Sequence, residues 1–228
     1  MALKAVFLGL KGVIINDESI HQKLINDLLV QENLRADEYD FQRYCVGRSD
    51  RDCLRELLKC RGRIVTEDYL TKLIAKKAQA YQKEIADLKL SVIDGLTEFL
   101  HGLQQQNIPA ILVTSALKAE ATEIIERLDL SSYFKEIVAA EDITNSKPDP
   151  ELYQVAINKL NLQPSECIAV EANYPGIAAA KQAGILAIAI SHLHPLHMLQ
   201  RRASFTVDYF EDIDLERINK LLSSTSEK

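Results

Sequence analysis

Polar and charged side chains that can hold an anion follow the apolar stretches of this sequence. Thr114 and Ser115 come directly after one apolar stretch, Glu171 follows a second, and Lys11 follows the first one in the chain. Lys147 lies in the loop between two further stretches. Ammonium groups and hydroxyls donate hydrogen bonds to anion oxygens. The two lysines and the glutamate leave a net charge of +1, so together these residues could form a site that accepts an anion.

The same set is poorly suited to a metal. Mg²⁺ in proteins is held by oxygen ligands, usually one or two carboxylates with water and phosphate. Glu171 is the one carboxylate among the strand-end residues named above, and the ammonium of Lys11 would repel a cation beside it. We therefore expect no metal and no cofactor at this site.

The remaining sequence alternates between short apolar stretches and helical patterns. Expected strands are 5–10, 110–113, 136–139, 167–170, 186–190 and 205–207, and expected helices are 96–106, 118–128, 150–160, 177–183 and 215–222. Strands that are apolar throughout and alternate with helices indicate a parallel sheet covered on both faces. The predicted fold is α/β, a doubly wound parallel sheet. Ligands bind beyond the carboxyl ends of such strands, where the polar residues described above would converge.

A helical insertion interrupts this pattern after the first strand. Residues 16–90 are rich in Leu, Lys, Arg, Glu and Gln, and their leucines recur three and four positions apart. That spacing is typical of amphipathic helices. We predict a helical cap at 16–90 inserted into an α/β core made of 1–15 and 91–228. The polar tail, 223–228, is expected to fray.

Five segments in this order resemble motifs of the haloacid-dehalogenase superfamily, and in particular of its β-phosphoglucomutase and phosphoglycolate-phosphatase branch. They are Lys4–Glu18, Asp94–Leu100, Val113–Ser115, Ser146–Pro150 and Val170–Gly184. Each motif alone is weak, but five in register cover nearly the whole chain. The resemblance implies a Rossmann-like core with an inserted cap and the chemistry of phosphoryl transfer.

The resemblance also implies which catalytic groups are missing. Active members carry two aspartates after the first strand, one as nucleophile and one as acid/base, and a third aspartate that completes an Mg²⁺ site. The matching positions here are Gly9, Lys11 and Ala172. The groups that contact the phosphoryl oxygens, the hydroxyl of Thr114 or Ser115 and the ammonium of Lys147, are kept, and so is the acidic Glu171.

This pattern of loss predicts a protein without the usual catalysis. No aspartyl-phosphate can form at Gly9, and Lys11 would need a strongly depressed pKa to serve as a base. We expect a pseudophosphatase that binds a phosphorylated small molecule, an inorganic anion or a protein partner. One alternative is an active phosphatase or phosphomutase-type hydrolase with altered residues, for which Asp17, Asp142 and Asp149 are the nearest carboxylates. Another is a scaffold or assembly protein with a vestigial cleft.

Two questions about the site stay open at this stage. Lys11 either pairs with Glu171, which neutralises the cleft, or stays available for an anion, because buried charges prefer to be paired. The resemblance also places His21, Gly47 and Ser49 of the cap beside the cleft. His21 is equally compatible with a helix surface, and Asp50 stands where the branch has a cap-loop arginine, which puts phosphosugar specificity in doubt.

Composition excludes several other classes of protein. The chain has 228 residues, 47% of them hydrophobic and 26% charged, with a formal net charge of -6. Nucleic-acid binding usually requires a clustered basic face, which the interleaved acids interrupt. No apolar run approaches the roughly 20 residues of a membrane span, and we expect no secretory signal. We expect no nucleic-acid or membrane partner, a cytoplasmic location and four reduced cysteines.

Overall fold

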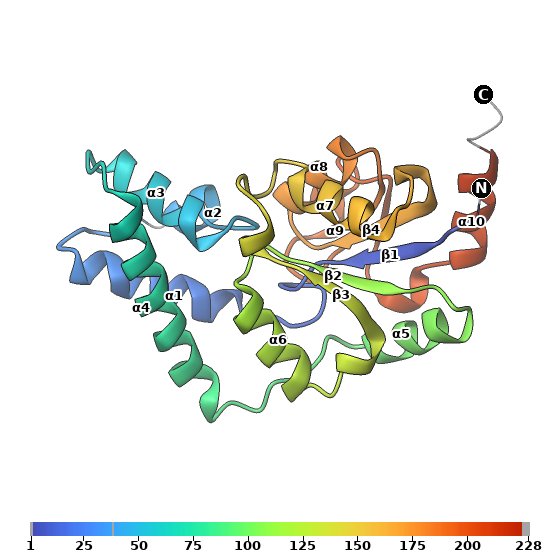
Figure 1. Ribbon diagram of the computed structural model, residues 1–228, viewed down its shortest axis with the longest axis horizontal. Helices are drawn as coiled ribbons and strands as arrows, with labels where there is room; N and C mark the ends of the chain where they lie inside the picture. Colours follow the sequence, from blue (N-terminus) through green and yellow to red (C-terminus); the bar gives the residue numbers. More distant parts are fainter. Residues whose placement is uncertain (1, 38, 225–228) are drawn as a thin grey trace.

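A six-stranded parallel sheet forms the centre of the computed structural model, which describes residues 2–37 and 39–224 (Figure 1). The spatial order is β3-β2-β1-β4-β5-β6. The strands are β1 (Ala5–Leu8), β2 (Ala110–Val113), β3 (Phe134–Val138), β4 (Cys167–Glu171), β5 (Leu186–Ile190) and β6 (Phe205–Val207). The predicted doubly wound α/β class is confirmed.

Helices cover both faces of the sheet because successive side chains of a strand point to opposite sides. Val6 and Leu8 of β1 join one apolar cluster, and Phe7 joins the other. The first cluster includes residues of α5 (Leu96–Gln105), α6 (Lys118–Arg127) and α10 (Leu215–Ser224), and the second includes residues of α7 (Glu151–Leu160) and α8 (Tyr174–Gln182). The remaining short helices are α9 (Leu196–Leu199), η1 (Ser131–Tyr133), η2 (Ala140–Asp142), η3 (Pro164–Glu166) and η4 (Phe210–Asp212).

Four helices follow β1 and lie beyond one end of the sheet (Figure 1). They are α1 (Glu18–Gln31), α2 (Asp40–Tyr44), α3 (Asp50–Cys60) and α4 (Glu67–Ala86). These helices enclose an apolar cluster of their own, to which α3 contributes Leu54 and Leu57. The far end of α4 instead places Tyr81 and Ile85 in the cluster under the sheet. The cap is therefore packed onto the core through α4.

The structure corrects several bounds of the expected elements, and α8 begins at Tyr174 rather than at 177. The first strand ends at Leu8 rather than Leu10, because the chain then turns tightly and the Ile14 amide donates to the Leu10 carbonyl at 2.8 Å. β3 spans Phe134–Val138, two residues earlier at its start than expected. The expected fraying of the tail concerns residues that mostly lie outside the described part of the chain.

The expectation of four reduced cysteines is wrong. Cys45 follows α2 directly and Cys53 lies in the first turns of α3, and the reversal between the two helices brings their Cα atoms to 4.5 Å. The two sulfurs form a disulfide. Cys60 is an exposed free thiol, and Cys167 is a buried one in β4, as expected for a core residue. Within the described residues, no helix is long and apolar enough to cross a membrane.

Candidate functional site

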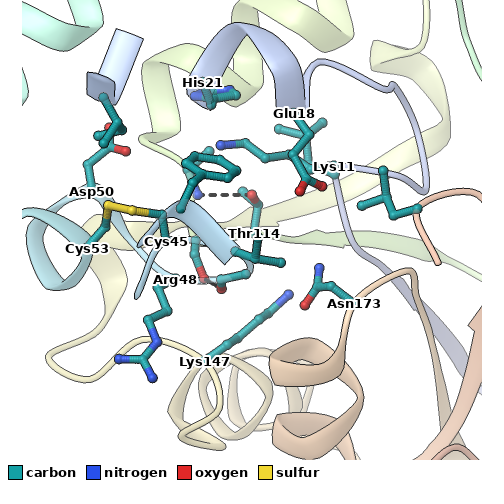
Figure 2. A pocket seen from close by; sticks show the side chains of 18 of the residues that line it. Lys11, Glu18, His21, Cys45, Arg48, Asp50, Cys53, Thr114, Lys147 and Asn173 are labelled. Carbon is teal, nitrogen blue, oxygen red and sulfur yellow. Dashed lines mark hydrogen bonds between the residues drawn. A yellow bond between two sulfur atoms is a disulfide. The ribbon is translucent and has the colours of Figure 1, made fainter. Parts of the chain in front are cut away.

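A cleft that is partly open to solvent lies where the cap meets the carboxyl ends of the strands. The core lines it with Lys11, Thr114, Ser115, Lys147 and Glu171, and the cap lines it with His21 and Gly47, as Figure 2 shows for several of them. The strand order brings the polar residues together, because β1 lies between β2 and β4. Of the other predicted site residues, Gly9 and Ala172 lie just behind this lining and Ser49 caps α3.

Lys147 and Glu171 form a buried ion pair at the floor of the cleft. Lys147 Nζ also donates to the Val113 carbonyl at 3.1 Å, and the Tyr153 hydroxyl donates to Glu171 Oε1 at 2.6 Å. Burial and the charge of Glu171 raise the pKa of Tyr153 well above its usual value, so the phenol keeps its proton. The sequence left open whether Lys11 pairs with Glu171. In the structure, Glu171 pairs with Lys147 instead.

The Glu171 carboxylate fills the space that two glycines leave free. A Cβ added to Gly9 would lie 2.9 Å from Glu171 Oε2. A Cβ added to Gly176, in the first turn of α8, would overlap the same oxygen. The absence of a side chain at Gly9 therefore matches the position of Glu171, and any larger residue there would require the carboxylate to move.

Lys11 lines the cleft and, like Arg48 on the cap side, forms no ion pair among the described residues. Its ammonium points toward His21 in Figure 2. Its positive charge contributes to lowering the pKa of Asp17, His21 and Asp50, behind or at the cap side of the cleft. The charge of Lys11 therefore acts on the carboxylates of the cap side.

The hydroxyls of Thr114 and Ser115, which follow β2, make different hydrogen bonds. Thr114 Oγ1 accepts a hydrogen bond from the Ala116 amide at 3.0 Å, and its own proton remains available to a ligand. Ser115 Oγ instead donates to the carbonyl of Gly47 at 2.9 Å and so ties the cap to the core. Ser49 is similarly occupied, because its hydroxyl accepts from the Asp52 amide at the start of α3. The geometry favours Thr114 over the two serines as a ligand contact.

His21 is buried between the cap and the core rather than on a helix surface. Its Nε2 lies 3.0 Å from Asp17 Oδ2, which also accepts from the Tyr81 hydroxyl at 2.6 Å. The His21 and Tyr81 rings stack with their centroids 4.6 Å apart. A carboxylate partner assigns the imidazole proton to Nε2. Burial acts to raise the pKa of Asp17, but the hydrogen bonds and neighbouring positive charges hold it below the usual value.

Lys77 completes this buried polar cluster from α4. Its Nζ donates to Asp50 Oδ2 at 2.8 Å and lies 3.8 Å from Glu120 Oε2, with the side chain 1% exposed. Burial acts to lower the pKa of Lys77, but the two carboxylates raise it, so the ammonium stays charged. Glu120 Oε1 lies 3.6 Å from His21 Nε2, and neither Glu120 oxygen has a hydrogen-bond partner among the described residues. The cluster links α1, α3 and α4 of the cap to α6 of the core.

Sequence reasoning missed Lys77 and Glu120, and treated Asp50 only as a lost arginine. The signal for Lys77 was present: Leu70, Leu73, Lys77 and Tyr81 recur three and four positions apart, so the lysine lies on the buried stripe of α4. Glu18, Arg48 and Asn173 also line the cleft. The sequence motifs include Glu18 and Asn173 but assign no role to either.

The neutral imidazole of His21 should make stability depend on pH. Burial, and then the charges of Lys11 and Lys77, lower the pKa of His21 below 6.5, so the unfolded chain binds a proton that the folded protein does not. Stability is complete above the unfolded pKa and falls as the pH drops below it. Between about pH 7 and pH 5 we expect the free energy of unfolding to fall more steeply in the native protein than in His21→Gln, by up to about 1.4 kcal/mol per pH unit.

Urea denaturation at several pH values measures this difference. Gln is the matched change, because its amide donates to Asp17 but does not titrate. The carboxylates that face His21, Asp17 and Glu120, are present in both proteins, so their own titration cancels in the comparison. Equal slopes for the two proteins would contradict the assignment of a neutral buried His21.

Two of the alternative carboxylates, Asp142 and Asp149, lie away from the cleft. Asp142 accepts from the Ala139 amide and pairs with Lys159, and Asp149 accepts from the Glu151 amide at the start of α7. Neither lines the cleft. In the part of the chain that the structure describes, no three His, Cys, Asp or Glu side chains are placed to hold a metal ion.

The donor set of the cleft does not fit Mg²⁺. Hard cations need several oxygen ligands. Three carboxylates line the cleft, and each already has a partner: Glu171 Oε1 accepts from Lys147 and Tyr153, Asp50 Oδ2 from Lys77, and Glu18 Oε1 from Gln42. Gly9 and Ala172 supply no side-chain oxygen, and the ammonium of Lys11 lines the same cleft. No step through a metal is therefore derived for this chain.

The fold and the position of the cleft define a protein with a doubly wound α/β core and an inserted helical cap, and comparison of the sequence with known families agrees. The profile of the haloacid dehalogenase-like hydrolase family matches residues 9–190. The chain belongs to this family.

Known relatives are similar along nearly the whole chain. Validoxylamine A 7'-phosphate phosphatase of Streptomyces hygroscopicus subsp. limoneus is 28% identical, covering 86% of this chain and 89% of the relative. The β-phosphoglucomutase of Bacillus subtilis is 27% identical, covering 96% and 95%. The crystal structure of β-phosphoglucomutase from Clostridium difficile superposes with a TM-score of 0.86 at 20% identity, covering 99% of this chain and 100% of the other. The fold is the one expected from the sequence motifs.

Proposed function

We propose that this chain binds a phosphorylated small molecule in its cleft and does not hydrolyse it through an aspartyl-phosphate. The observation that carries the proposal is at Gly9. This position has no side chain, and the Glu171 carboxylate lies 2.9 Å from where its Cβ would be. Glu171 cannot replace the missing nucleophile in this state, because Lys147 and Tyr153 hold its Oε1 by charge and hydrogen bonding. A carboxylate neutralised in this way is a weak nucleophile.

Three features support an anionic ligand. Lys11 lines the cleft without an ion-pair partner among the described residues, Thr114 has a hydroxyl proton to donate, and Arg48 lies at the cap side of the opening. The relatives of this chain support a phosphorylated ligand, because their names include a phosphatase of phosphorylated carbohydrates from Thermotoga maritima, 28% identical over 183 residues. A phosphosugar-like compound is the class that we propose.

The first expected result is an absence of phosphoester hydrolysis. The purified chain, incubated with para-nitrophenyl phosphate and Mg²⁺, should release nitrophenol no faster than the protein-free solution, because no carboxylate lies free at the end of β1. Absorbance of the released nitrophenolate measures the rate. Turnover at rates typical of phosphatases that disappears in Lys147→Ala would sink the proposal.

The second expected result is stabilisation by phosphate without Mg²⁺. A ligand that binds only the folded state stabilises it by about 2.7 kcal/mol at one hundred times its Kd. We expect inorganic phosphate to raise the melting temperature in the presence of a chelator, and Lys11→Met to remove this rise. Lys89→Met is the matched control, because Lys89 is exposed and far along the chain from the cleft residues. Stabilisation that appears only when Mg²⁺ is added would contradict the metal-free site.

A second candidate is an active phosphatase or phosphomutase-type hydrolase with altered catalytic residues. The names of the relatives favour it, and so does one contact: Glu171 places a carboxylate within reach of Lys147, at the strand ends where the chemistry of this family takes place. Activity that is lost in Glu171→Gln but kept in Asp17→Asn would favour this candidate over the binding protein.

A further inference from the structure

The Cys45–Cys53 disulfide lies in the wall of the cleft, next to the segment of the cap that contacts the core (Figure 2). It closes the loop 46–52, which joins α2 to α3. This segment is named the cap loop below. Both cysteines are buried, at 8% and 2% exposed, and both line the cleft.

The cap loop makes the hydrogen bonds that close the cap over the strand ends. The Gly47 carbonyl accepts from Ser115 Oγ at 2.9 Å. Asp52 Oδ2 accepts from the Ser146 amide at 3.1 Å and from its hydroxyl at 2.5 Å. These contacts reach the loops after β2 and β3, so the cap loop connects the cap to two separate core segments.

The cap loop packs tightly against the core at Gly47. Gly47 has a positive φ of 73°, and a Cβ there would lie 2.5 Å from Asn173 Oδ1. The loop therefore packs against the side chains of Asn173 and Pro175 with no room for a side chain of its own at Gly47. A crosslink at its two ends restricts the conformations that a flexible loop can adopt. The disulfide is placed to hold the loop in the one conformation that satisfies Ser115 and Ser146.

We propose that Cys45 and Cys53 form a thiol–disulfide modification site that controls closure of the cap, with small thiols as the reacting class. Reduction by a dithiol breaks the Cys45–Cys53 bond, transfers one proton to each cysteine sulfur and joins the two reagent sulfurs in a new disulfide. The cap loop then gains freedom, and its contacts with Ser115 and Ser146 open more often. Oxidation restores the closed cleft.

The Ser146 amide is a reporter of this opening, because it belongs to the core and its acceptor, Asp52, belongs to the cap. Residue-resolved hydrogen–deuterium exchange of the ligand-free protein, with and without dithiothreitol, measures its protection. We expect exchange at Ser146 to become at least about tenfold faster on reduction, with a matching increase within the cap loop. Mass spectrometry after alkylation confirms which cysteines were reduced.

The matched control is Cys60→Ser, which removes the exposed free thiol and leaves the disulfide. It should respond to dithiothreitol as the native protein does, while Cys45→Ser/Cys53→Ser should exchange fast at Ser146 with or without the reagent. The native protein compared in its two redox states keeps the test valid if the double variant does not fold. Unchanged exchange at Ser146 after full reduction would overturn the proposal, as would free Cys45 and Cys53 thiols in protein purified without reductant. No ligand enters the measurement, so its outcome is independent of the proposed function.

Discussion

Replacing Lys77 by Met should lower the free energy of unfolding by about 3–5 kcal/mol, although Lys77 lies outside the cleft lining. Removing one partner of a buried ion pair leaves the opposite charge without compensation, which is the strongly destabilising case. Here Asp50, at 2.8 Å, and Glu120, at 3.8 Å, would both lose their cation. Met fills a similar volume, so little of the loss would come from packing. Urea denaturation measures the difference.

Two variants separate charge from other causes. Lys76→Met changes the exposed neighbour on the same helix and should alter stability by less than about 0.5 kcal/mol. Lys77→Met combined with Asp50→Asn and Glu120→Gln removes the whole charge cluster and should recover much of the loss, since the remaining groups no longer need a counter-ion. If the triple variant is as unstable as Lys77→Met, the ion pairs are not the cause.

Replacing Gly9 by Asp should destabilise the protein by about 3 kcal/mol. The Cβ alone meets Glu171 Oε2 at 2.9 Å, and overpacking of this kind costs about 1–3 kcal/mol. The new carboxylate would also lie beside a second buried carboxylate, and like charges in one site oppose each other. Thermal and urea unfolding at neutral pH measure the loss.

Matched glycine variants separate the destabilisation caused by the added Cβ from that caused by the added carboxylate. Gly9→Ala adds only the Cβ and should cost less than Gly9→Asp. Gly102→Ala, in α5, meets no atom within 4 Å and should stabilise by about 0.5–1 kcal/mol through helix propensity. Gly9→Asp in a Glu171→Gln background should regain part of the loss. Equal stability of Gly9→Asp and Gly102→Ala would mean that Glu171 moves aside freely, and the central observation behind the proposed function would fail.

The sequence predicted the parts of the site that topology controls. Thr114 follows β2, Glu171 is the last residue of β4, and Lys147 lies in the loop before α7. Parallel strands bring their carboxyl ends to one edge of the sheet. Their convergence in one cleft therefore follows from element order alone. Two ammonium groups and one carboxylate were also apparent, but their pairing was not. Whether Lys11 or Lys147 forms the ion pair with Glu171 depends on differences of a few ångströms in position. The order of residues along the chain does not contain that information.

Other parts of the site depended on packing between segments far apart in the chain. The Cys45–Cys53 bond requires the reversal between α2 and α3, which brings two Cα atoms to 4.5 Å. The ion pairs of Lys77 join α4 to α3 and α6. The apolar stripe of α4 marks Lys77 as buried, but sequence alone identifies neither its partners nor the pairing of the two cysteines, because both depend on how helices pack in three dimensions.

The sequence by itself determined the α/β fold, the inserted cap and the missing side chain at Gly9, because hydrophobic periodicity and residue identity are local properties. Only the tertiary structure decided what fills the space beside Gly9. Glu171 takes that space, held by Lys147 and Tyr153, and Lys11 is left at the cleft without an ion-pair partner among the described residues. The physical reason is that a buried charge must find its counter-charge in three dimensions, and the partner chosen depends on burial and distance rather than on order along the chain.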